Sequence, residues 1–167
     1  SLGQPATIND ALNHTTTLTW DSQGRMSKIT DANSKQTNFG YDARARVTSI
    51  TNAKNETTVL TYDLNNRPKK VIYPDTNFTE FTYDIAGRRI AVADPLNHST
   101  NFVYDSAYRL TSITDALNHS TAFGYDLMSN LTSQADALGN VTNLEYDEFN
   151  RLKKVKYLLP VSGGMRL

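Results

Sequence analysis

The stretch TNFVYDSAYRLTSITDALNH, residues Thr100 to His119, contains the pattern that decides the fold of this chain. Its aromatic-aspartate pair recurs every 21 residues with no change of spacing. A period held this strictly indicates one structural unit that is repeated and stacked on itself. Such proteins bury apolar side chains between neighbouring copies, which leaves few positions for a single active site. The seven pairs are Trp20-Asp21, Tyr41-Asp42, Tyr62-Asp63, Tyr83-Asp84, Tyr104-Asp105, Tyr125-Asp126 and Tyr146-Asp147.

The residues before each pair predict a β-strand. A threonine lies four positions before the aromatic residue and a leucine or phenylalanine two positions before it, as in Thr100, Phe102 and Tyr104. Alternation on every second residue is typical of a strand with one buried face, whereas a helix needs spacings of three and four. We therefore expect the seven aromatic rings to form a ladder, with the ring of each copy stacked on the ring of the next.

The residues after each pair predict a tight hairpin turn. Arginine lies five positions after the aromatic residue in six copies, and Asn130 takes its place in the other copy. In four copies the residue directly before this position is Gly or Asn, which tolerate positive φ. This pattern fits a three-residue hairpin loop whose last residue is left-handed. A catalytic pair is needed once, so a repeated pair predicts structural ion pairs that close the turn. The six pairs are Asp21-Arg25, Asp42-Arg46, Asp63-Arg67, Asp84-Arg88, Asp105-Arg109 and Asp147-Arg151.

The second strand of the unit breaks the simple alternation. Met26 is expected opposite the aromatic residue, yet the next apolar residue, Ile29, comes three positions later. Either a β-bulge resets the pleat or both faces of the sheet are partly covered. A polar connection such as Asp115-Ala116-Leu117-Asn118-His119 follows. The predicted unit is thus strand, tight turn, strand and longer turn, with no helix.

Together these features predict an all-β fold, in which 21-residue hairpins pair edge to edge in a continuous, spirally wound antiparallel sheet with open ends. We expect the repeat array to cover residues 1–157 and an irregular tail to cover residues 158–167. The alternative is a propeller with two hairpins per blade, but blades repeat at about forty residues and here successive hairpins are equivalent. Open edges recruit other strands, so a homodimer is a possible partner.

Composition excludes several classes of function. The chain has 17 basic and 17 acidic residues, no cysteine, and no apolar run long enough to span a bilayer. We therefore expect no nucleic-acid partner, no membrane span, no cofactor and no metal site. The candidates for ligand contact are Tyr108, an aromatic residue in a turn, and His98 and His119, which share one position in adjacent copies. The chain begins in mid-unit at Ser1, so we expect it to be a piece of a longer polypeptide.

The copies resemble a known family. TEFTYDIAGR, residues 79–88, and the stretch quoted first carry the tyrosine-aspartate repeat of Rhs and wall-associated proteins, which is related to repeats of insecticidal toxin complexes and teneurins. The resemblance covers roughly residues 7–157. It implies a secreted or cell-surface bacterial protein whose repeats form the wall of a hollow shell. The implied partners are the rest of a larger Rhs-type polypeptide and the toxic or adhesive domain that the shell encloses or presents.

The resemblance does not extend to an enzymatic activity. Many family members follow the repeats with an aspartate-dependent self-cleavage segment, and nothing after Tyr157 resembles it. We therefore expect a scaffold that is not an enzyme. The alternative function is a repeat module that binds cell-surface carbohydrate or protein through its turns.

Overall fold

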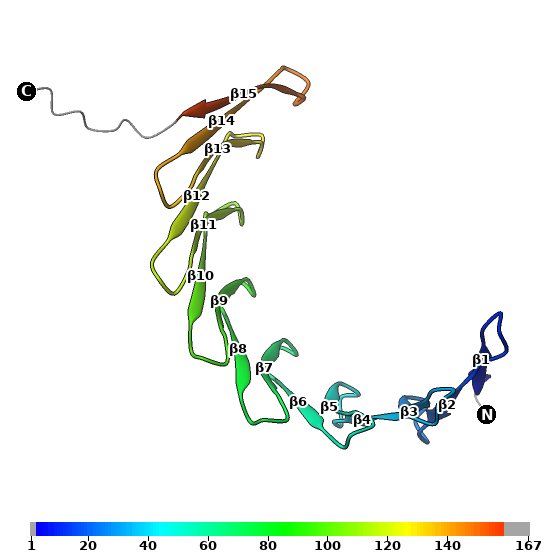
Figure 1. Ribbon diagram of the computed structural model, residues 1–167. Coiled ribbons are helices and arrows are strands. Elements are labelled where there is room, and N and C mark those ends of the chain that lie inside the picture. Colours follow the sequence, from blue (N-terminus) through cyan, green and yellow to red (C-terminus); the bar gives the residue numbers. More distant parts are fainter. Residues whose placement is uncertain (1–2, 159–167) are drawn as a thin grey trace, which may run out of the picture. The chain divides into compact units, whose positions relative to one another are not determined.

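The computed structural model of the chain describes residues 3–158, and within that range its regular elements are all β-strands (Figure 1). Fifteen strands form an open antiparallel sheet in which strand order follows chain order. No element of this range is a helix with the length and hydrophobicity that crossing a bilayer requires. The strands are β1 (Thr7–Asn9), β2 (Thr15–Trp20), β3 (Met26–Thr30), β4 (Gln36–Tyr41), β5 (Val47–Thr51), β6 (Thr57–Tyr62), β7 (Pro68–Ile72), β8 (Phe78–Tyr83), β9 (Arg89–Ala93), β10 (Ser99–Tyr104), β11 (Leu110–Thr114), β12 (Ser120–Tyr125), β13 (Leu131–Ala135), β14 (Val141–Tyr146) and β15 (Leu152–Leu158).

The predicted all-β class and the continuous hairpin sheet are confirmed. The chain divides into two compact units, Ser1–Glu80 and Phe81–Leu167. In the first unit the strands from β1 onward pair without a break. In the second unit β9 to β15 pair in the same way. Propeller blades would interrupt this pairing after every four strands, so the propeller alternative is wrong.

The spiral winding and the domain boundary stay predictions. Strand β15 ends at Leu158, one residue past the predicted end of the array. The remainder of the expected tail, residues 159–167, lies outside the described residues.

A β-bulge explains the broken alternation in the second strand of the unit. Trp20 pairs with Met26 and Thr19 pairs with Lys28, so Ser27 is an extra residue without a partner position. The same register shift recurs in the other YD hairpins whose pairing is described. The extra residue turns the following side chains over by one position. Met26 and Ile29 therefore share a face despite their spacing of three.

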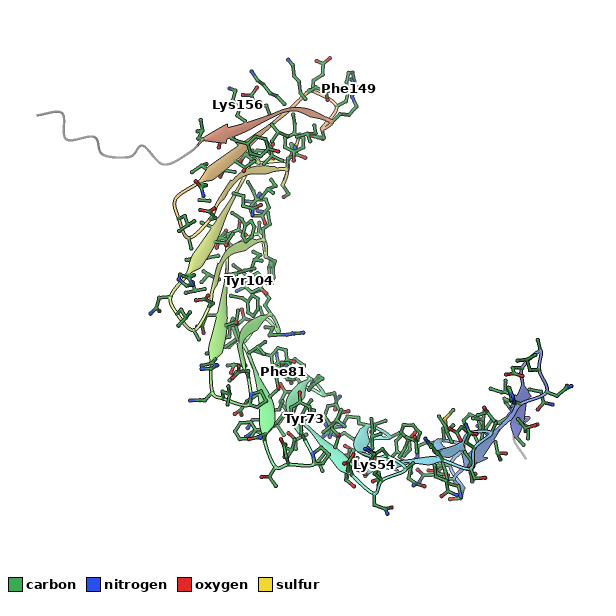
Figure 2. The ribbon with its side chains drawn as sticks, in the orientation of Figure 1. Lys54, Tyr73, Phe81, Tyr104, Phe149 and Lys156 are labelled. Atoms are coloured by element: carbon green, nitrogen blue, oxygen red, sulfur yellow. The ribbon has the colours of Figure 1, made fainter. Side chains whose placement is uncertain are left out.

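One face of the sheet carries the threonine, bulky and aromatic positions, and we name it the aromatic face. In β4 and β5, Tyr41 lies opposite Val47 and Phe39 lies opposite Ile50 on this face. The labelled Phe81 and Tyr104 belong to it in the second unit (Figure 2). The other face carries mostly small and polar side chains, with Val59, Ile72 and Phe78 as bulky apolar exceptions in the first unit. The two faces thus differ in chemistry along each unit.

A single sheet leaves little of either unit fully buried. Among residues 3–158, Leu18 is the one buried hydrophobic side chain, with 8% of its surface exposed. Side chains of the aromatic face are mostly half-buried against their lateral neighbours. Within residues 3–158 each unit is one layer of strands, so strand pairing and contacts between adjacent copies stabilise it, as in other repeat proteins.

Candidate functional site

Both turns of the unit have one geometry, which corrects the prediction of a tight turn followed by a longer one. In the turn at Asp21, the Asp21 amide donates to the Arg25 carbonyl at 2.8 Å and the Gly24 amide donates to the Asp21 carbonyl at 3.0 Å. The connection at Asp115 repeats these bonds, with the Asp115 amide to His119 at 3.0 Å and the Asn118 amide to Asp115 at 3.1 Å. Each strand pair is therefore closed by the same loop.

The fourth residue of each loop is left-handed, as the sequence predicted for the YD turns. Its φ is +77° at Gly24, +61° at Ala45 and +66° at Tyr108. Asn97 and Asn118 take the same conformation in the other row of turns, with φ of +65° and +66°. The position is therefore fixed by loop geometry and not by one residue type.

The aspartate that opens each YD turn holds that turn together. Asp21 Oδ1 accepts the amides of Gln23 and Arg25, each at 2.9 Å. The backbone N–H of Arg25 lowers the pKa of Asp21 below its ordinary value, and the Arg25 side chain acts in the same direction. The Asp21 carboxylate is thus an acceptor for the loop backbone and a counter-ion for the arginine.

The structure brings all six predicted pairs of Asp and Arg within ion-pair distance. Each carboxylate Oδ2 lies 2.6–2.7 Å from a guanidinium nitrogen of the arginine four residues later. Five of the six pairs are half-buried, whereas the Arg151 side chain is 73% exposed. Charge-assisted contacts of this geometry orient both side chains. At Arg25, Arg88 and Arg109 the pair fixes the arginine so that its outer nitrogen donates to a backbone carbonyl of the following copy.

Sequence analysis missed a partner of several tyrosine rings, namely the arginine of the preceding copy, as at Tyr41, Tyr62, Tyr104 and Tyr125. Cζ of Arg25 lies 4.6 Å from the centroid of the Tyr41 ring, and Cζ of Arg109 lies 4.8 Å from that of Tyr125. The Arg25 guanidinium also donates to the Asp42 carbonyl at 3.2 Å. At these copies a guanidinium thus lies over the ring, which is a favourable cation-π arrangement, and the ladder of ring on ring stays a prediction.

The tyrosine hydroxyls extend the same link between copies. Tyr41, Tyr62 and Tyr125 donate to backbone carbonyls fifteen residues earlier at 2.7, 2.7 and 2.8 Å. Trp20 Nε1 donates to the Pro5 carbonyl at 2.9 Å. The fixed spacing of Arg and Tyr at the 21-residue period is the sequence signal that could have revealed this row.

The histidines occupy the position that arginine holds in the YD turns. His98 Nδ1 lies 3.1 Å from Asp94 Oδ2, and His119 Nδ1 lies 3.0 Å from Asp115 Oδ2. Each histidine is thus paired with the aspartate of its own turn. Among residues 3–158, no group of three or more His, Cys, Asp or Glu side chains is arranged to hold a metal ion.

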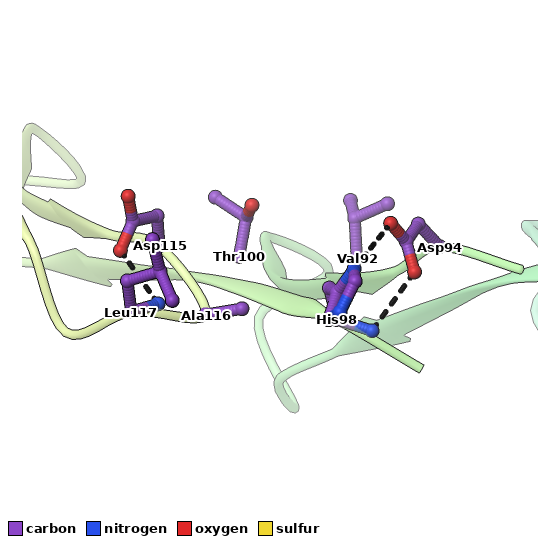
Figure 3. A pocket seen from close by; sticks show the side chains of 7 residues that line it. All are labelled: Val92, Asp94, His98, Thr100, Asp115, Ala116 and Leu117. Carbon is purple, nitrogen blue, oxygen red and sulfur yellow. Dashed lines mark hydrogen bonds and ion pairs between the residues drawn. The ribbon is translucent and has the colours of Figure 1, made fainter. Parts of the chain in front are cut away.

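The candidate ligand contacts lie in different turns. Tyr108 is 64% exposed, and the Arg88 guanidinium lies 4.9 Å from its ring centroid. His98 lines an open cavity of about 360 Å³ with Leu117 and Asp115 of the next turn in its row (Figure 3). Val92 and Thr100, from the aromatic face, complete the apolar part of this cavity. Tyr108 and His119 are not among its lining residues.

This architecture defines a class of protein, a repeat array of hairpins whose aspartate turns and tyrosines lock each copy to the next. Comparison with known families agrees with that class. The teneurin YD-shell family matches residues 1–102, and the RHS repeat family matches residues 104–136 and 129–158. The chain belongs to the YD-repeat family of Rhs and teneurin shells. No curated protein sequence matches it.

Solved structures share the fold at low sequence identity. The chain is similar to the TcdB2-TccC3-Cdc42 complex, with a TM-score of 0.73 and 18% identity over 90% of the chain. It is similar to TcdB2-TccC3 without its hypervariable C-terminal region, with a TM-score of 0.72 and 18% identity over 89%. The Photorhabdus luminescens Tc holotoxin pore gives a TM-score of 0.71 and 18% identity over 88%. The chain spans about 9% of the length of each matched chain.

Proposed function

We propose that this chain is a section of the wall of a hollow Rhs-type shell, which encloses or presents a toxic or adhesive domain. The observation that carries the proposal is a sheet of locked hairpins that forms a single layer with two chemically different faces. A wall needs such a layer, because each face contacts a different environment. The family match and the small share of each matched chain that it covers support a part of a larger polypeptide.

The proposed role is steric and not catalytic. The repeated Asp and Arg side chains pair with each other, and the repeated tyrosines bond to the backbone of the preceding copy in most turns. Groups held in this way stabilise the layer and are not directed at a substrate. We propose that the whole polypeptide acts outside the cell or at its surface, as the toxin-complex likeness suggests.

Limited proteolysis of the whole polypeptide tests the wall function. The domain that the repeats enclose should resist protease in the native protein. Replacing Leu18 with Ala, which removes the buried side chain of the first unit, should accelerate cleavage of that domain. Replacing the exposed Leu64 with Ala is the matched control and should leave the rate unchanged. Equal cleavage in the native protein and in a polypeptide without the repeats would contradict the proposal.

A second candidate function is binding of carbohydrate or protein at the turns. The exposed Tyr108 ring and the cavity beside His98 favour it, because aromatic rings stack on the apolar faces of sugars. Titration of the chain with surface glycans should then give saturable binding that Tyr108→Ala or His98→Ala abolishes. Binding that neither substitution weakens would remove this candidate.

The sheet edges are the remaining proposed contact. Strand β15 is exposed along its whole length and pairs only with β14 among the described strands. Such an edge can add a strand from a second copy. Light scattering after size-exclusion chromatography should show a dimer at high concentration, and a monomer at every concentration would exclude edge pairing.

A further inference from the structure

One copy of the repeat lacks the arginine that forms an ion pair with the turn aspartate in the other YD turns. In the turn between β12 and β13 that position holds Asn130, and Asp126 is the one YD aspartate in residues 3–158 without an ion pair. The Asn130 side-chain amide donates to Asp126 Oδ2 at 2.9 Å and to Asn150 Oδ1 at 3.0 Å. The shorter side chain closes its own turn but ends before the ring of the next copy.

The next tyrosine in the row, the half-buried Tyr146, consequently lacks the guanidinium partner of the regular copies. In the preceding copy Tyr125 lies under the Arg109 guanidinium and its hydroxyl donates to the Leu110 carbonyl at 2.8 Å. Within the described part of the chain, Tyr146 has neither a guanidinium over its ring nor a hydrogen bond from its hydroxyl. A cation-binding ring is therefore available here and occupied in the neighbouring copy.

A cavity opens at this place, lined by residues of the turn that joins β12 to β13 and of the turn that joins β14 to β15. Its volume is about 460 Å³. Carboxylates, an aromatic ring and apolar side chains converge in it. Lining residues include Asp126, Met128, Thr132, Leu144, Tyr146 and Glu148.

The regular copies show what chemistry such a space accepts. The Arg109 guanidinium lies 2.7 Å from Asp105 Oδ2 and donates to the Asp126 carbonyl at 2.6 Å, with its Cζ over the Tyr125 ring. The equivalent three groups of the irregular copy are the Asp126 carboxylate, the Asp147 carbonyl and the Tyr146 ring. A planar fork of donors fits a carboxylate, a carbonyl and a ring face better than a spherical ammonium does.

The charges around the cavity favour a cation. Among residues 3–158, neither the Asp126 nor the Glu148 carboxylate has an ion pair, whereas Asp147 is paired with Arg151 and Glu145 with Lys156. The side-chain amide of Asn130 lowers the pKa of Asp126, so this carboxylate is ionised at neutral pH. Arg109 lies at the carbonyl side of Asp126, the relation that Arg88 has to Asp105 in the regular copies.

We propose that this cavity binds the side chain of an arginine from a partner polypeptide, which supplies in trans the guanidinium that the other copies supply themselves. The occupant is a polypeptide and not free arginine because the opening is bordered by apolar surface. Leu127 and Met128, at the tip of the same turn, are 103% and 73% exposed. They offer contacts to an apolar residue next to the arginine. This binding site goes beyond the proposed wall function and does not depend on it.

Nuclear magnetic resonance of the full 167-residue chain tests the site. The probe is a blocked Leu-Arg-Leu tripeptide, and the comparison peptides carry citrulline or lysine in place of arginine. We expect saturable shifts of the Tyr146 ring and the Asp126 amide with the arginine peptide. Citrulline has the same shape without the charge and should bind at least about tenfold more weakly. Free arginine should bind more weakly than the peptide, because it lacks the apolar neighbours.

Substitutions in the two rows of turns provide the matched comparison. Asn130→Arg restores the regular residue and should abolish peptide binding by filling the cavity from within. Asn140→Arg places the same residue at the equivalent position of the other row, where Asn140 pairs with Asp136, and should leave binding unchanged. Asp126→Asn retains the Oδ1 acceptor for the Met128 and Asn130 backbone amides and should weaken binding by removing the charge.

Several results would overturn the proposal. These are the absence of saturable shifts, equal binding of the arginine and citrulline peptides, and equal binding of the lysine peptide. Equal loss of binding in Asn130→Arg and Asn140→Arg would also overturn it, because the site would then not lie in this cavity. Unchanged backbone amide signals in the remote copies establish that each variant is folded.

Discussion

The left-handed loop position gives a prediction in which two alanines of one turn respond with opposite signs. Ala45 has φ of +61°, whereas Ala43, two positions earlier in the same exposed turn, keeps φ negative. A left-handed conformation costs an L-residue about 1–2 kcal/mol, and glycine avoids that cost. Glycine also raises the backbone entropy of the unfolded chain, which costs about 0.5–1 kcal/mol.

The balance of these two free energies sets the sign of the stability change at each position. Ala45→Gly should stabilise the protein by about 0.5–1 kcal/mol, because relief of the left-handed conformation exceeds the added entropy. Ala43→Gly has no strain to relieve and should destabilise by about 0.5–1 kcal/mol. Both side chains are exposed, so neither substitution removes packing. The two variants should therefore differ by about 1–2 kcal/mol.

Urea unfolding followed by circular dichroism measures the difference, and hydrogen exchange localises it. The Asp42 amide donates to the Arg46 carbonyl at 3.0 Å across this loop. Its exchange should slow in Ala45→Gly and accelerate in Ala43→Gly. If both variants shift the urea midpoint in the same direction, the assignment of strain to position 45 is refuted.

Three further perturbations follow from the same geometry. Tyr125→Phe removes a hydroxyl that donates to the Leu110 carbonyl at 2.8 Å. In urea titrations this substitution should lower the free energy of unfolding by about 0.5–1.5 kcal/mol. The control Tyr108→Phe, at an exposed ring, should change the free energy of unfolding little. Leu18→Ala should cost about 2–5 kcal/mol by the same titration, and Leu64→Ala, at a 90% exposed position, should stay within about 0.5 kcal/mol. The Arg46 guanidinium lowers the pKa of Asp42, so the stability that the Asp42 carboxylate contributes is present above its unfolded-state pKa and is lost as pH falls through its folded-state pKa. The urea midpoint should therefore fall on acidification, and it should fall less steeply in Asp42→Asn. Parallel pH profiles of the two proteins would contradict this linkage.

The repeat, the strands and the turns can be predicted from the order of residues in the chain. The positive φ before each arginine and the pairing of Asp21 with Arg25 follow from interactions within four residues of the chain. The alternation of Thr37, Phe39 and Tyr41 follows from the period of a strand. Local chemistry specifies such features, and repetition made each of them visible several times.

The contacts between adjacent copies, in contrast, depend on how the strands pair in three dimensions. The bulge at Ser27, the reach of Arg25 to the Tyr41 ring and the cavity beside Asn130 depend on strand register and on the lateral distance between turns. The ladder of rings was expected from spacing alone, but a guanidinium held by Asp21 lies against the Tyr41 ring because strand pairing brings the two turns side by side. Contacts between residues sixteen positions apart are set by that geometry, which no short stretch of sequence contains.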